Sequence, residues 1–408
     1  MSIAFVVQRY GAEVAGGAEA LCRDTARALV RAGEEVTVFT TTARDYLTWA
    51  PYYPVGTTTD DGVTVRRFAV DPPDPQRSAD LVRHLGLNPG DPVLEAEWAK
   101  AQGPVSRDML TALRDVGARH PPVPDTGGCL APGRDCPRVV ALWTYLYATS
   151  QMAMPIVRDR AIVVPLAHEE PMLRFALTRG VIRSAKAHAF MVPEEQALVR
   201  QMVGTGDIPG VVVGAGLDPA PDGDADRIRR TRPLPRRFAL YLGRVDASKG
   251  VDALIRAHSA YRDSGGELGL VLAGREAAGL DIPGWVFTTG FISNEERADL
   301  LAAAEVVVLP SPYESLSLVA LEAWRAGRPT LGYARSEVVA GQTARSGGGL
   351  LYTGPDTYGT QLRRLARNPE ERRAFGEQGR AFAAGWTWDA CVARWREVIN
   401  LAADTAGP

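Results

Sequence analysis

The sequence has little cysteine, little lysine and no excess of charge of either sign. Its 408 residues include 4 cysteines, and the formal net charge is −2 at pH 7. A chain that binds nucleic acid needs a basic surface to neutralise phosphates, and this balance provides none. We therefore expect no nucleic-acid partner.

The four cysteines do not form a pattern that predicts a metal site. Cys22 and Cys391 fall inside expected helices, while Cys129 and Cys136 lie in a segment rich in proline and glycine. Their spacing is wider than that of the usual zinc-binding pairs, so no metal site is expected. A disulfide between Cys129 and Cys136 is conceivable, but a reducing cytosol disfavours it.

Long apolar runs are also missing. No stretch reaches the roughly 18 apolar residues of a membrane helix, and the chain enters a strand at once without a basic region and long apolar core. We therefore expect a cytoplasmic protein. Residues 174–186 mix basic and apolar side chains. Such a segment can lie on an anionic membrane, but a solvated helix face is the favoured interpretation.

Apolar strand-like runs alternate with amphipathic helical stretches along the whole chain. With 46 % apolar residues, this alternation predicts parallel βαβ units in two domains of the doubly wound α/β class. We place one domain at 1–210, a linker rich in proline and charge at 211–237, and a second Rossmann-like domain at 238–385. The expected strands are 3–7, 35–40, 63–68, 139–143, 161–166, 188–192, 211–213, 238–242, 268–273, 286–289, 306–309 and 329–332.

Two segments are rich in Pro, Gly and Asp and are too long for ordinary connections. They are residues 71–92 and 120–137. We expect each to be a functional or mobile loop.

The most informative segment follows the expected strand Val306–Leu309. Glu314 and Glu322 stand eight positions apart, and a helix is expected from Ser317 to Arg325. The amides of Leu316, Ser317 and Leu318 would then point unpaired beyond the sheet, where the helix dipole favours an anion such as a diphosphate. The alternative interpretation is two solvated surface glutamates.

Two cations follow another expected strand of the second domain. Arg244 and Lys249 come after the strand ending at Leu242, and ligands of doubly wound sheets bind at the carboxyl ends of strands. Fixed cations there can stabilise the charge of a leaving diphosphate without a metal. Alternatively, Lys249 pairs with Asp246 in an ordinary helix-preceding loop.

The first domain offers weaker signals. Gly16 and Gly17 precede a helix, where their backbone could approach a diphosphate or an acceptor, although glycines there are often turn formers. His168 follows the strand at 161–166 and is placed at its carboxyl end. It is either a ligand contact or a satisfied structural residue beside Glu169 and Glu170.

Together these segments resemble a known family. The Glu-x7-Glu pattern, the Gly243-Arg244 to Lys249-Gly250 loop and the Gly16-Gly17 loop are similar to those of retaining nucleotide-sugar glycosyltransferases of the family 4 type. The resemblance spans almost the whole chain. It implies the GT-B fold, in which two Rossmann-like domains face a cleft and a C-terminal helix, here within 386–408, packs back on the first domain.

The resemblance also implies roles for residues. Arg244 and Lys249 would hold the donor diphosphate, Glu314 the donor sugar and Glu322 the ribose. His168 would contact the sugar from the opposite domain.

Further positions complete the implied donor site. Gly274 and Ile292, beside Phe291, resemble the nucleobase pocket. Ser317 replaces the usual glycine of the family, which bears on the fit of the donor sugar.

The implied activity is metal-independent transfer of a sugar from a nucleoside-diphosphate sugar to a hydroxyl acceptor with retention of configuration. The donor is a co-substrate, and no other cofactor is expected. The acceptor is a small molecule, a glycan or a lipid-linked hydroxyl. A GT-B nucleotide-sugar epimerase and a non-catalytic nucleotide-sugar binding protein are the alternatives, and the sequence does not name the base, the sugar or the acceptor.

Overall fold

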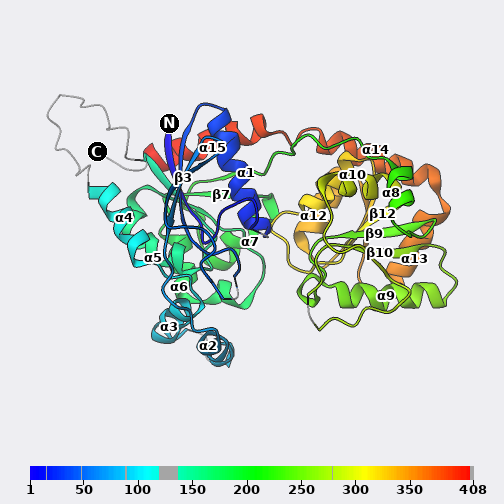
Figure 1. Ribbon diagram of the computed structural model, residues 1–408, viewed down its shortest axis with the longest axis horizontal. Coiled ribbons are helices and arrows are strands. Elements are labelled where there is room, and N and C mark those ends of the chain that lie inside the picture. Colours follow the sequence, from blue (N-terminus) through cyan, green and yellow to red (C-terminus); the bar gives the residue numbers. More distant parts are fainter. Residues whose placement is uncertain (15, 47, 88–89, 119–136, 278, 405–408) are drawn as a thin grey trace. The chain divides into compact units, whose positions relative to one another are not determined.

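The computed structural model describes residues 1–14, 16–46, 48–87, 90–118, 137–277 and 279–404 (Figure 1). The chain divides into two compact units. Unit 1 comprises Met1–Gly216 with Trp388–Pro408, and unit 2 comprises Leu217–Thr387. Cys129 and Cys136, and nearly all of the predicted loop 120–137, lie outside the described residues.

Unit 1 contains a sheet of eight strands in the order β3-β4-β2-β1-β5-β6-β7-β8. The register places Ala4 of the central strand beside Thr37 on one side and Val140 on the other. All described pairings are parallel except that of β3 with β4. The strands are β1 (Ser2–Val6), β2 (Glu35–Thr41), β3 (Gly56–Asp60), β4 (Val63–Phe68), β5 (Val139–Trp143), β6 (Ala161–Val164), β7 (Ala187–Phe190) and β8 (Gly210–Val212).

Strand β3 was not predicted. Its sequence, Gly56-Thr-Thr-Thr-Asp60, is polar and its residues are mostly exposed, so it has no apolar pattern. Its backbone pairs antiparallel with β4 at the edge of the sheet. Hydrogen bonding to a neighbouring strand, rather than burial, creates this element.

Helices surround the sheet of unit 1. They are α1 (Gly17–Arg31), α2 (Pro75–Leu87), α3 (Pro92–Gln102), α4 (Arg107–Ala118), α5 (Ala148–Val157), α6 (Ala176–Arg183), α7 (Pro193–Val203) and α15 (Trp388–Asp404), with short 3-10 turns at Arg158–Arg160 and Pro171–Arg174.

The prediction of a loop at 71–92 is wrong. Helix α2 occupies most of this segment and packs against α3. Leu81 and Leu85 are buried in a small core together with Trp98 and Phe175, and the last two rings meet edge to face at 5.2 Å. The prediction missed this amphipathic helix because the segment is rich in proline, glycine and aspartate, which all favour turns.

The final helix, α15, belongs to unit 1, as the predicted fold requires. Trp395 lies 5.4 Å from the ring of Phe5 and 5.9 Å from that of Trp143. Arg394 Nε donates to the carbonyl of Val213 at 2.9 Å. The buried thiol of Cys391 lies on the same helix.

Unit 2 contains a parallel sheet of six strands in the order β11-β10-β9-β12-β13-β14. The strand β14 (Gly349–Tyr352) was not predicted. The others are β9 (Phe238–Leu242), β10 (Gly269–Ala273), β11 (Phe287–Thr288), β12 (Val306–Leu309) and β13 (Thr330–Tyr333).

Helices also cover the sheet of unit 2 (Figure 1). Helices α9 and α13 contact one another and contribute Leu254, Tyr261 and Leu362 to the main core. Trp324 is buried on α11 and donates through Nε1 to the carbonyl of Gly348 at 2.9 Å. The helices are α8 (Ala225–Thr231), α9 (Val251–Asp263), α10 (Asn294–Ala303), α11 (Leu318–Arg325), α12 (Glu337–Ser346), α13 (Pro355–Arg367) and α14 (Pro369–Ala383).

The segment 211–237, expected to be a linker, contains α8. Asp224 caps this helix, and Arg227 on it donates through Nε to the buried carboxylate of Asp299 on α10 at 2.6 Å. An ion pair to a neighbouring helix thus orders a segment whose composition indicates a linker.

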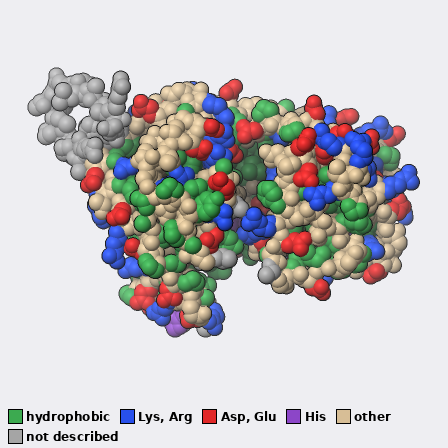
Figure 2. All heavy atoms as spheres, in the orientation of Figure 1, with side chains coloured by type: hydrophobic (Ala, Val, Ile, Leu, Met, Phe, Trp, Pro, Cys, Tyr) green, Lys and Arg blue, Asp and Glu red, His purple; other side chains and the backbone are tan. Residues whose placement is uncertain are grey.

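Acidic and basic side chains are interspersed over the visible face of unit 2 (Figure 2). Among the described residues, no helix is long and apolar enough to cross a membrane.

Candidate functional site

Two loops meet at the carboxyl edge of the sheet in unit 2. One follows β9 and the other follows β12, and these strands are paired and parallel. Gly250 lies where the loops touch. Its φ is +73°, and a Cβ there would lie 2.5 Å from the carbonyl oxygen of Pro310. Only glycine fits this close approach at positive φ, which brings Lys249 beside the Pro310 loop.

Lys249 and Glu314 form an ion pair between these two loops. The distance from Nζ to Oε1 is 3.0 Å, and the side chains are 35 % and 20 % exposed. The alternative in which Lys249 pairs with Asp246 is therefore not what the structure contains. Asp246 instead accepts the backbone N–H of Lys249 at 3.1 Å and pairs with Arg244.

The Asp246 carboxylate orders the cationic loop. Burial opposes its ionisation, but hydrogen bonds from Ser248 and Arg244 outweigh burial and hold the pKa of Asp246 below its usual value. Arg244 and Lys249 therefore lie in one turn, both fixed to the same carboxylate, one through its guanidinium and the other through its amide. This arrangement can present two positive charges to an anion.

Glu322 has a partner that the sequence did not reveal. Arg297 on α10 donates from Nη1 to Oε1 of Glu322 at 2.9 Å and to Oε2 at 3.2 Å. Arg297 follows the capping box of α10, in which Ser293 and Glu296 cap each other. That motif predicts the start of α10, but it carries no information about contact with α11.

The expectation of unpaired amides before α11 is wrong for two of the three residues. The N–H of Ser317 donates to Oε1 of Gln342 at 3.0 Å, and the N–H of Leu318 donates to the carbonyl of Leu316 at 3.1 Å. Gln342 is fully buried on α12, so its amide oxygen requires a donor inside the protein. The hydroxyl of Ser317 caps the helix by accepting the N–H of Ala320 at 3.4 Å.

The predicted nucleobase residues lie beside the cationic loop. Gly274 has a φ of +153°, and a Cβ there would lie 1.8 Å from the carbonyl oxygen of Gly243. Its N–H donates to Gly290 at 3.0 Å. Ile292, two residues further on, is buried, whereas Phe291 is 77 % exposed. The loops after β9, β10 and β11 are thus connected at one edge of the sheet.

In unit 1, a buried ion pair supports the glycine loop. Glu19 on α1 pairs with Arg9, and Gln8 Nε2 donates to Oε1 of Glu19 at 2.8 Å. A Cβ at Gly16 would lie 2.1 Å from Oε2 of Glu19, whereas one at Gly17 would meet no atom within 4 Å. Gly16 therefore packs directly against the Glu19 carboxylate, and a side chain there would have to displace that carboxylate. Gln8 and Arg9 were not predicted, and their positions after β1 were the signal that could have indicated them.

His168 follows β6, which ends at Val164, two residues earlier than predicted. Its Nε2 lies 3.4 Å from Oε2 of Glu170. The hydroxyl of Tyr145 donates to the other oxygen of Glu170 at 2.6 Å. His168 is 31 % exposed, so its imidazole is oriented by the protein but reachable from solvent.

A buried carboxyl group holds the backbone next to His168. Glu195 on α7 accepts the N–H of Ala167 at 2.8 Å and that of Met191 at 2.6 Å. Burial raises the pKa of Glu195 to about 8, and the backbone hydrogen bonds oppose that shift. Leu166 adopts a φ of +51°, so this turn is held in an uncommon conformation.

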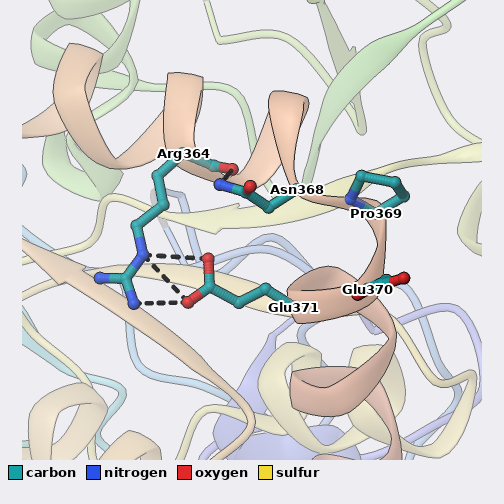
Figure 3. Close-up of a pocket in the computed structure, with 5 residues that line it drawn as sticks. All are labelled: Arg364, Asn368, Pro369, Glu370 and Glu371. Carbon is teal, nitrogen blue, oxygen red and sulfur yellow. Dashed lines mark hydrogen bonds and ion pairs between the residues drawn. The ribbon is translucent and has the colours of Figure 1, made fainter.

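A surface hollow lies between α13 and α14 (Figure 3). Arg364 and Glu371 face each other across it, with Nε 3.0 Å from both carboxylate oxygens. None of the predicted residues lines it. It is an exposed ion pair between helices, separate from the carboxyl edge of the sheet.

Part of the chain matches a family of known proteins. Residues 223–382 match the family model described as Glycosyl transferases group 1. D-inositol 3-phosphate glycosyltransferase of Kineococcus radiotolerans is 28 % identical over 423 residues, which cover 95 % of this chain and 91 % of that relative.

Two solved structures share the fold. Sucrose-phosphate synthase from Thermosynechococcus elongatus has a TM-score of 0.69 at 18 % identity, with 98 % of each chain covered. The Anabaena protein HepE, in complex with UDP and glucose, has a TM-score of 0.67 at 15 % identity, with 98 % of this chain and 99 % of that chain covered. The predicted GT-B fold is thereby confirmed.

Proposed function

We propose, on the premise that residues 223–382 match the family model described as Glycosyl transferases group 1, that the protein transfers a sugar from a nucleoside-diphosphate sugar to a hydroxyl acceptor with retention of configuration. The observation that carries the proposal is the Lys249–Glu314 pair beside Arg244, on adjoining loops at the carboxyl edge of the sheet. In doubly wound sheets this edge is where ligands bind.

The cations and the carboxylate have separate tasks in this mechanism. Lys249 and Arg244 neutralise the charge that develops on the leaving diphosphate. Glu314 accepts hydrogen bonds from hydroxyls of the donor sugar. Because the Lys249–Glu314 pair is partly exposed, Lys249 can turn to phosphate without leaving a buried charge behind.

The bond changes occur on one face of the sugar. The bond from the anomeric carbon to the diphosphate oxygen breaks, and a bond to the acceptor oxygen forms on the same side. The acceptor's proton passes to the leaving phosphate, so no protein nucleophile is required. Arg244 and Lys249 would supply positive charge to the leaving diphosphate, and we therefore propose a reaction without a metal.

We propose the substrates by chemical class. HepE was solved with UDP and glucose, and the Kineococcus relative is named for inositol phosphate, which supports a nucleoside-diphosphate donor and a polyol acceptor. We extend the proposal to small-molecule, glycan or lipid-linked hydroxyls, and to a cytoplasmic location. His168 is proposed to contact the donor sugar, a role that stays a prediction.

The test is a transfer assay with the purified chain. UDP-, GDP-, ADP- and TDP-sugars are combined with sugar and inositol phosphate acceptors, and released nucleotide and product mass are measured. Transfer with the same anomeric configuration, determined by NMR, is the expected result. Sugar isomerisation without transfer would favour an epimerase, and binding without any turnover would favour a non-catalytic protein.

A further inference from the structure

Arg297 occupies a position that the donor chemistry described above does not use. It lies in the first turns of α10, and Glu322 lies in the second turn of α11. Both helices begin at the carboxyl edge of the sheet, after β11 and β12 respectively. The Arg297 side chain is 43 % exposed and that of Glu322 is 18 % exposed. The pair is therefore open to a ligand at that edge.

The hydrogen bonds leave part of the carboxylate available. One nitrogen of Arg297, Nη1, contacts both oxygens of Glu322, at 2.9 and 3.2 Å. An ionised carboxylate has about four lone-pair sites, so roughly two remain after this contact. A ribose has two neighbouring hydroxyls that could donate to them.

The charge of Arg297 also matters. A carboxylate near a diphosphate repels it, and a guanidinium bound to that carboxylate offsets the repulsion. Helix α10 is fixed independently, because Arg232 contacts Glu296 at 2.7 Å and the carbonyl of Thr289 at 3.3 Å. The Arg297 contact is thus not the sole connection that holds α10 in place.

We propose that Arg297 is a positioning residue that fixes the Glu322 carboxylate so that its remaining lone pairs accept the ribose hydroxyls of the donor nucleotide. This inference rests on the proposed function, a nucleoside-diphosphate donor, and on the ribose role that the family resemblance implies for Glu322. It extends that function to a residue outside the Glu-x7-Glu pattern. The expected consequence is selectivity for ribose over deoxyribose, rather than a change in the transfer step.

The experiment compares ribonucleotides with their 2′-deoxy forms by titration calorimetry. UDP, GDP and ADP and the corresponding deoxynucleotides are titrated into the parent chain and into Arg297→Ala, Arg297→Gln, Glu322→Ala and Arg232→Ala. The last variant is the matched control, since it removes another arginine that holds α10 but does not touch Glu322. Melting temperatures confirm that each variant is folded, and Arg297→Lys is used in place of an Arg297 variant that is not.

We expect the parent to prefer the ribonucleotide by about tenfold or more, because a site built for a hydroxyl discriminates against its loss. Both Arg297 variants should lose most of this preference and bind the deoxynucleotide almost as the parent does. Arg232→Ala should keep the preference. If the role of Arg297 were purely structural, its substitution would weaken the binding of both nucleotides equally, and that outcome overturns the inference.

Glu322→Ala distinguishes the ribose role of Glu322 from the positioning role of Arg297. If it loses the preference while folded Arg297 variants keep it, the role of Arg297 is wrong and the ribose role of Glu322 stands. If Glu322→Ala keeps the preference, the ribose assignment itself is wrong, and the inference is overturned with it. Failure of every nucleotide to bind the parent chain overturns the proposed donor site.

Discussion

The two units each carry an ion pair at the carboxyl edge of their sheet, but the two pairs are buried to different degrees. In unit 2, Lys249 and Glu314 are 35 % and 20 % exposed. In unit 1, Arg9 and Glu19 are each only 5 % exposed. An exposed pair can exchange one partner for a charged ligand at little cost. A buried pair cannot, because separating the two charges would leave each of them buried without an opposite charge beside it.

This difference assigns different tasks to the two edges. The pair in unit 2 is suited to receive the diphosphate of a donor. The pair in unit 1 is suited to shape the loop that contains Gly16, which packs directly against Glu19. Similar residue types therefore serve binding in one unit and scaffolding in the other, and burial decides which.

The largest effect should come from breaking the buried pair. Glu19→Ala removes the carboxylate that balances the buried Arg9 charge, and removing one member of such a pair typically costs about 3 to 5 kcal/mol. Urea unfolding of the purified variant measures this. The exposed pair gives the control, because Glu314→Ala should change stability by less than about 1 kcal/mol. Equal losses in both variants would remove the distinction between the units.

Turnover, in contrast to stability, should depend on the exposed cations of unit 2. Lys249→Ala and Arg244→Ala should each lower turnover by on the order of a hundredfold or more, since each removes a cation aimed at the developing diphosphate charge. Arg256→Ala is the control, because Arg256 forms an exposed ion pair with Asp252 on α9. Steady-state kinetics on folded variants would refute the assignment if turnover stayed near that of the parent.

The two glutamates of unit 2 should separate binding from transfer. Glu322→Ala should raise the dissociation constant of the nucleotide by about tenfold, the value of one good hydrogen bond, with a smaller effect on turnover. Glu314→Ala should mainly slow transfer, because its contact is with the sugar as charge develops at the anomeric carbon. Unchanged binding of UDP, GDP, ADP and TDP to Glu322→Ala would remove the ribose role.

Carboxyl groups in the two units should also respond oppositely to pH. The pKa of Glu195 in unit 1 is raised from 4.5 to about 8, so the folded state binds more protons than the unfolded state between these values. Its contribution to stability is therefore lost as the pH rises through that range. The pKa of Asp246 in unit 2 is lowered, and its contribution is lost as the pH falls.

Glu195→Gln tests this contrast, because glutamine resembles the protonated carboxyl and does not titrate. Between about pH 5 and about pH 8.5, the melting temperature of the variant should rise relative to that of the parent. Each kcal/mol of unfolding free energy that the parent loses by ionisation of Glu195 corresponds to roughly 2 to 4 °C. Glu194→Gln on the same helix is the control. A difference that stays constant across this range would contradict the raised pKa.

The smallest expected effect concerns metal. Because Arg244 and Lys249 already supply positive charge at the diphosphate, removal of divalent ions with EDTA should change the transfer rate by no more than about twofold, far below the effect of losing a required catalytic metal. The assay is run before and after dialysis against EDTA and again with added Mg²⁺ or Mn²⁺. Loss of transfer that one of these ions restores would show that the cations of unit 2 do not suffice.

Much of the fold was determined by local sequence. The strands at Val139–Trp143, Phe238–Leu242 and Val306–Leu309 lie where their apolar runs predicted them, because parallel strands buried on both faces require continuous apolar sequence. Strands β3 and β14 and helix α2 were not predicted. Their formation depends on neighbours with which they pair or pack.

For the candidate site, the sequence by itself determined which residue types follow which strand, including Arg244, Lys249, Glu314 and Glu322. Only the tertiary structure decided their partners. Lys249 contacts a residue 65 positions away, Arg297 meets Glu322 across 25 positions, and the amide expected to bind phosphate is occupied by Gln342. Side-chain pairing depends on how separate helices and loops pack, and no local spacing in the sequence encodes that.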